Sequence, residues 1–155
     1  MSKIVRVVAT IIVPFILLYG LYLIVHGHLT PGGGFQGGAV IASGIALLFV
    51  AFNFRYVRGF LSEDSLSTIE CSGALLFVGI AFGGIVTTTF FANFLLGSPV
   101  FGGIPVGGPE PATIWSGGTI PLMNIAVGMK VSAGLLAIIF MMWFAASKEE
   151  GDQNE

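Results

Sequence analysis

Four long apolar runs constrain what this chain can fold into more than any other feature of its sequence. Residues 7–25, 32–54 and 71–94 contain no charged side chain, and residues 122–146 contain only Lys130. A helix needs about 20 mostly apolar residues to cross a bilayer. Charged residues make up 9% of the 155 residues, against about 25% in soluble domains. We therefore predict an all-α integral membrane protein with four transmembrane helices in one domain over residues 1–147.

The positions of lysine and arginine predict the orientation of these spans. Five cations flank the spans: Lys3, Arg6, Arg55, Arg58 and Lys148. With four spans they all fall on one side, which is the cytosolic side under the positive-inside rule. Both termini are then cytosolic, with a polar tail over residues 148–155, and the Gly/Pro-rich segment 93–121 is an outer loop. The first run is too long for a signal peptide and no cleavage site follows it, so we expect a retained helix.

Lys130 stands inside the fourth run. A lysine at the centre of a spanning helix costs about 2.5–3.5 kcal/mol on insertion scales, and such residues usually face protein or water and mark ion paths. We interpret Lys130 as an ion-path candidate. There are two alternatives. The long side chain of Lys130 snorkels, so that its ammonium group reaches the membrane surface, or it forms a fixed ion pair with a partner subunit.

Glu70 is a second ion-path candidate, at the cytosolic start of the third run. Ser67-Thr68-Ile69-Glu70 fits the capping-box pattern S-x-x-E, which explains the carboxylate as a helix cap. The alternative is a carboxylate at the mouth of a cytosolic ion path. If the helix begins at Ser62 instead, Glu70 lies two turns inside it.

The stretch HGHLTPGGGFQGG at residues 26–38 links the first two runs. It is not a phosphate-binding P-loop, because no lysine and hydroxyl follow its last glycine. His26 and His28 are the only histidines and no Cys/His cluster accompanies them, so we predict no metal site. Either histidine is an ion-path candidate through proton transfer, or forms hydrogen bonds at a polar helix end.

Packing remains as the explanation for the glycines. Pro31 ends the first helix and starts the next at its first position. Gly33 with Gly37, and Gly34 with Gly38, have the GxxxG spacing that lets helices approach closely in membranes, and Phe35 and Gln36 project from this bare strip. We predict a helix-docking motif that comprises Pro31, Gly33, Gly34, Phe35, Gln36, Gly37 and Gly38.

Several functions find no support in the sequence. There is no pair of carboxylates, nucleophile–base pair or cofactor motif, so we predict neither catalysis nor a bound cofactor. Nothing resembles a basic nucleic-acid surface. Cys71, the only cysteine, is interpreted as a small buried apolar residue.

The motif HGHLTPGGGFQGG between the first two of four spans resembles the B subunit of the Mrp-type multisubunit sodium/proton antiporters. The resemblance covers about Val5 to Ala146 and is weakest from Leu95 to Thr119. It rests on His28, Pro31, Gly32, Gly33, Gly34, Phe35, Gly37 and Gly38, and on a late-helix lysine at the position of Lys130.

An equivalent subunit recurs in archaeal membrane-bound hydrogenases and their sulfur-reducing relatives. The resemblance implies a small multi-pass subunit of the cell membrane that works with other membrane subunits in moving Na⁺ and H⁺. The alternatives are a purely structural scaffold, or a small channel that acts alone as an oligomer.

Overall fold

The computed structural model describes residues 2–29, 31–52, 62–101, 114 and 116–152. These contain four helices and no strand: α1 (Lys3–Val25), α2 (Gly34–Phe52), α4 (Glu63–Thr87) and α5 (Ile120–Asp152). Each is long and apolar enough to cross a membrane. The prediction of an all-α protein with four membrane spans is therefore confirmed.

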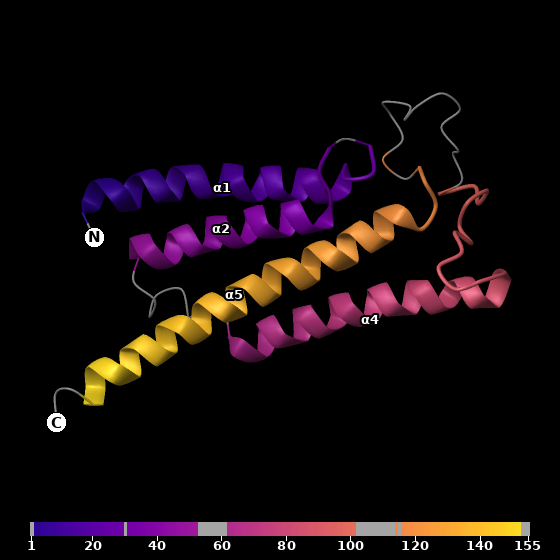
Figure 1. Cartoon of the computed structure of the whole chain (residues 1–155). Coiled ribbons are helices and arrows are strands. Elements are labelled where there is room, and N and C mark those ends of the chain that lie inside the picture. Colours follow the sequence, from indigo (N-terminus) through magenta and orange to yellow (C-terminus); the bar gives the residue numbers. More distant parts are fainter. Residues whose placement is uncertain (1, 30, 53–61, 102–113, 115, 153–155) are drawn as a thin grey trace.

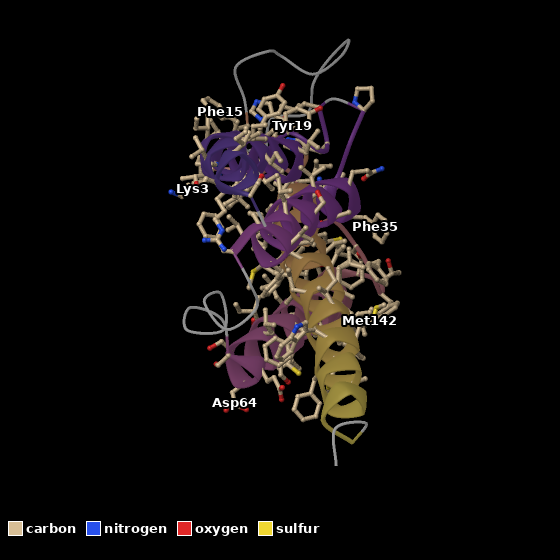
Figure 2. The ribbon with its side chains drawn as sticks, turned by 90° about the vertical axis from the view of Figure 1, so that its left-hand side faces the viewer. Lys3, Phe15, Tyr19, Phe35, Asp64 and Met142 are labelled. Atoms are coloured by element: carbon tan, nitrogen blue, oxygen red, sulfur yellow. The ribbon has the colours of Figure 1, made fainter. Side chains whose placement is uncertain are left out.

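The four helices form a row rather than a closed bundle (Figure 1). Helix α1 packs on α2, α2 on α5, and α5 on α4, while α1 reaches α5 only lightly. Figure 2, turned by 90°, shows α1 and α2 in the upper part of the row and α4 beside α5 in the lower part. Only 22% to 28% of the residues in each span are buried within the chain, so most of the apolar surface must meet lipid or other proteins.

The start of α1 and the end of α5 lie at the same end of the row, and the segments that follow α1 and α4 lie at the other (Figure 1). This is what an even number of spans requires. Two of the cations that support the predicted orientation, Arg55 and Arg58, lie outside the described residues.

Glycines set how closely neighbouring helices approach. A Cβ at Gly37 of α2 would lie 2.6 Å from the carbonyl oxygen of Gly20 on α1, and a Cβ at Gly38 would lie 2.8 Å from that of Gly128 on α5. Neither position can carry a side chain unless backbone moves. Further along the row, Leu136 of α5 forms a buried cluster with Ala42 of α2 and Leu66 of α4.

The helix boundaries differ from the apolar runs. The prediction that Pro31 ends the first helix and begins the next is wrong. Helix α1 ends at Val25 and α2 begins at Gly34, because Gly33, with φ of 148°, is not helical. Helix α4 ends at Thr87 rather than Phe94, and Phe91 has a φ of 62° that a right-handed helix excludes. Helix α5 continues through the start of the predicted polar tail to Asp152.

The segment after α4 is hydrogen-bonded to the residues before α5, by the Gly118 N–H to the Phe101 carbonyl (3.0 Å) and by the side chain of Asn93. The Asn93 amide donates to the carbonyl of Gly117 (2.9 Å) and accepts from the N–H of Thr119 (2.8 Å). Ser116 and Thr119 are buried there. Asn93 thereby provides a partner for one of the backbone N–H groups at the helix start, where intrahelical partners are missing.

Candidate functional site

The first turn of α4 decides where Glu70 lies. Ser62 is the N-cap, and its hydroxyl accepts from the N–H of Ser65 at 3.2 Å, followed by two acidic residues that suit the positive end of a helix. Of the two interpretations of Glu70, the capping box with Ser67 is wrong and the helix start at Ser62 is confirmed, because the N-cap lies five residues before Ser67. Glu70 lies seven residues into α4, about 10 Å along its axis.

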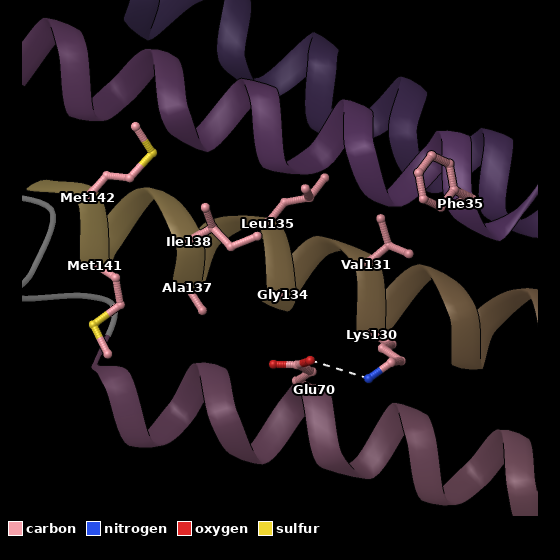
Figure 3. A pocket seen from close by; sticks show the side chains of 10 residues that line it. All are labelled: Phe35, Glu70, Lys130, Val131, Gly134, Leu135, Ala137, Ile138, Met141 and Met142. Carbon is pink, nitrogen blue, oxygen red and sulfur yellow. Dashed lines mark hydrogen bonds and ion pairs between the residues drawn. The ribbon is translucent and has the colours of Figure 1, made fainter.

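Glu70 meets Lys130 inside the spans. The ammonium nitrogen of Lys130 donates to a carboxylate oxygen of Glu70 at 3.3 Å (Figure 3). Lys130 lies ten residues after Ile120, about 15 Å along α5. Two residues that were interpreted separately in the sequence thus form one ion pair, and the fixed partner of Lys130 belongs to its own chain.

Gly73 brings the two helices together beside this pair. A Cβ on Gly73 would lie 2.7 Å from the carbonyl oxygen of Ala126 and 2.9 Å from the amide nitrogen of Lys130. On α5, Gly134 follows Lys130 by one turn, and a Cβ there would lie 3.5 Å from Glu70 Oε1. Small residues on both helices therefore leave room for the carboxylate between them.

The pair lies at the edge of an open groove in the face of the row. This groove, which we call the lateral groove, has a volume of about 570 Å³ and is lined chiefly by Phe35, Glu70, Lys130, Val131, Ile138 and Met142. Phe35 and Met142 project on the same side of the row (Figure 2). Half of the Lys130 side chain and 37% of that of Glu70 are exposed, so the pair is not enclosed by its own chain.

A second hollow of about 330 Å³ adjoins the pair toward the start of α4. It shares Glu70, Ala137 and Met141 with the lateral groove, and its other lining residues include Glu63, Asp64 and Ser67. Polar side chains therefore continue from the first turn of α4 to the ion pair.

The two histidines lie away from this pair, at the end of the row where α5 begins. His26 is the C-cap of α1, where its backbone N–H donates to the carbonyl of Tyr22. Its ring stacks on the Tyr22 ring, with 4.3 Å between the ring centroids. His28 lies in the following turn, close to Gly117. Burial, together with the nearby His26, lowers the pKa of His28 below 6.5, which favours the neutral imidazole.

The ring nitrogens of His28 are buried without a hydrogen-bond partner among the described residues, as is the side-chain nitrogen of Asn124. The described part of the chain holds no group of three or more His, Cys, Asp or Glu residues that could bind a metal ion.

The glycines predicted to dock are buried against helices of the same chain. Gly37 lies against α1, and Gly34 and Gly38 lie against α5, where the carbonyl of Asn124 directly faces Gly34. Pro31, Phe35 and Gln36 are exposed. Gly33 lies ahead of α2, so Gly33 and Gly37 do not form a helical GxxxG face.

Sequence reasoning missed two residues and misplaced one. Gly73 follows Glu70 by three residues on the same helical face, a spacing that signals close approach. No local pattern pointed to Asn93, whose partners are 24 and 26 residues away. Cys71, interpreted as buried, is exposed, because it lies on a face of α4 that no described helix covers.

Four spans in one row, with an ion pair inside them and open to one face, define a multi-pass membrane protein with a polar intramembrane site. Known proteins specify this class further. A family model described as "Domain related to MnhB subunit of Na+/H+ antiporter" matches residues 4–137, and the chain belongs to this family. The resemblance seen in the sequence is thereby confirmed.

Individual relatives agree with this assignment. An uncharacterized protein of Methanocaldococcus jannaschii is 39% identical over 79% of this chain and 45% of its own length. The B subunit of the Na⁺/H⁺ antiporter of Bacillus subtilis is 40% identical over 56% of this chain and 59% of its own length. The chain thus spans about half the length of these curated relatives. An antiporter protein of Staphylococcus haemolyticus, named as the mnhB2 subunit, is 30% identical over 88% of this chain and 91% of its own length.

Proposed function

We propose that this chain is a non-catalytic subunit of a multisubunit Na⁺/H⁺ antiporter in the cytoplasmic membrane, and that Glu70 and Lys130 contribute to its ion path. Family membership supports the first part. The observation that carries the second is the 3.3 Å ion pair inside the spans. Charged groups at such a depth are costly and commonly lie on ion or proton paths.

The pair suits proton or cation transfer in two respects. Glu70 presents carboxylate oxygens that can bind a cation, and Lys130 presents N–H donors that can orient water or a partner group beside it. The second hollow supplies polar side chains between Glu70 and the start of α4. His28 lies near the start of α5, at the end of the row away from this hollow. It is the candidate for proton exchange at the outer surface.

The test is transport by the assembled complex in membrane vesicles. We expect Lys130→Ala and Glu70→Ala to abolish most Na⁺-dependent proton movement while the complex still assembles. Lys3→Ala removes an exposed cation at the start of α1 and serves as the matched control, with transport unchanged. Normal transport by assembled complexes of both Lys130→Ala and Glu70→Ala would refute the ion-path role.

The second candidate function is a structural scaffold, which the open row favours because so much apolar surface is left for neighbours. It predicts unchanged transport in the same two variants. Leucine at Gly34 or Gly38, both packed within the chain, would disrupt the fold itself and so cannot decide between the two functions.

For the parent assembly we propose either a separate antiporter or the antiporter part of an archaeal membrane-bound hydrogenase or related sulfur-reducing complex. Purification in mild detergent followed by identification of the co-purifying membrane subunits decides between them. A nickel–iron hydrogenase subunit in the same complex supports the second, and purification of the chain alone as an oligomer contradicts both.

A further inference from the structure

The row of helices cannot enclose the ion pair by itself. Helix α5 has neighbours along the row, α2 on one side and α4 on the other. The two faces of the row are open, because no further described helix lies in front of it or behind it in the view of Figure 1. Glu70 and Lys130 belong to neighbouring helices of this layer, so one side of their contact opens onto the lateral groove.

The hydrogen-bonding capacity of Lys130 is mostly unused. An ammonium group has three N–H donors, and Glu70 accepts one at 3.3 Å as its only partner among the described residues. Half of the side chain remains exposed at a depth where lipid tails offer no acceptor. A covering group at this point must therefore present an oxygen or nitrogen lone pair to the ammonium nitrogen.

The surroundings of the pair suit a helix rather than water or lipid headgroups. Phe35, Val131, Ile138 and Met142 form apolar walls. Figure 3 shows Val131, Ile138 and Met142 on the side of α5 toward α2 and Phe35 on α2 itself, while the ion pair lies on the side of α5 toward α4. Gly134 and Ala137 line the groove near Lys130 and fill little of it. Small residues such as these allow close helix–helix approach in membranes. Methionine side chains at the end of the groove adapt readily to a partner's shape.

We propose that the lateral groove holds a transmembrane helix of another subunit, which places a carboxylate, carboxamide or hydroxyl oxygen against the ammonium nitrogen of Lys130. This inference rests on the proposed function for the existence of a partner subunit. The partner helix would close the open side of the pair, so that any path past Glu70 and Lys130 is completed by residues of both chains.

The test is photo-crosslinking in the assembled complex in its native membrane. The probe is p-benzoylphenylalanine, introduced genetically in place of Ile138, which lines the groove and is 57% exposed. The matched control position is Leu75 of α4, which is 73% exposed but does not line the groove. Crosslinked peptides are then identified by mass spectrometry.

We expect the probe at position 138 to join one transmembrane segment of a different subunit that carries a side-chain acceptor. Adding Lys130→Met should lower the yield roughly threefold or more, as expected for loss of an interhelical hydrogen bond, and Lys130→Arg should restore it. The yield at position 75 should stay unchanged. Lys130→Met removes the donor and keeps a chain of similar length.

Crosslinks from position 138 only to lipid, to a second copy of this chain, or to a helix without a polar side chain would overturn the proposal. If Lys130→Met fails to assemble, the crosslink from the otherwise unchanged chain decides alone. The proposed function fails separately: transport that is independent of Lys130, together with the expected crosslink, leaves the interface standing and removes the ion path.

Discussion

Replacing Gly73 with alanine tests whether close packing of α4 on α5 positions the ion pair. The new Cβ would lie 2.7 Å from the Ala126 carbonyl oxygen and 2.9 Å from the Lys130 nitrogen, whereas ordinary contact begins at 3.4 Å. Both neighbours are backbone atoms, so the helices must separate by at least a few tenths of an ångström. Overpacking of this kind costs about 1–3 kcal/mol, and alanine returns up to about 1 kcal/mol through its better helix propensity.

Gly79 provides a matched control on the same helix, because a Cβ there meets nothing within 4 Å. We expect Gly79→Ala to be neutral or slightly stabilising and Gly73→Ala to lower the free energy of unfolding by up to about 2 kcal/mol. Unfolding is measured on the purified chain in mild detergent by denaturant titration. Equal stability of the two alanine variants would refute the inferred contact between α4 and α5.

Three further predictions concern individual side chains. Because the folded state lowers the pKa of His28 below 6.5, stability should fall as pH drops below about 6.5; His28→Gln should flatten this profile in pH-dependent unfolding, and an unchanged slope would contradict it. Asn93→Ala should cost about 1–3 kcal/mol, since it leaves the N–H of Thr119 unpaired and removes one of the two donors to the Gly117 carbonyl; a melting temperature equal to that of the parent chain would show that the Asn93 hydrogen bonds are unimportant. Ser62→Ala should cost about 1 kcal/mol as the loss of an N-cap, while Ser67→Ala should cost little; the reverse order in thermal unfolding would place the helix start at Ser67.

The two ion-path residues illustrate how far the site could be predicted. Lys130 was recognisable because a charge inside a 25-residue apolar run is conspicuous without knowledge of any contact. Glu70 stayed ambiguous, since its meaning depends on where α4 begins, and Ser62 and Ser67 are both plausible caps by residue type. Only the structure distinguishes them, through the hydroxyl of Ser62 that accepts from Ser65.

The glycines also could be interpreted only in part from the sequence. Their spacing predicted close helix contacts, but spacing does not name the partner helix. The structure pairs Gly37 with α1 and both Gly34 and Gly38 with α5, inside one chain. Asn93 was beyond prediction, because its partners are distant in sequence and carry no recognisable pattern.

The sequence by itself determined the class of protein: apolar runs of this length cross a membrane as helices, because backbone groups in hydrocarbon must be paired within the segment. It also contained the motif of the antiporter subunit family. Only the tertiary structure decided that the helices stand in the row α1, α2, α5, α4 and that Glu70 meets Lys130 on an open face. The physical reason is that helix order and side-chain pairing depend on which small residues of different helices face one another, and no local pattern encodes that choice.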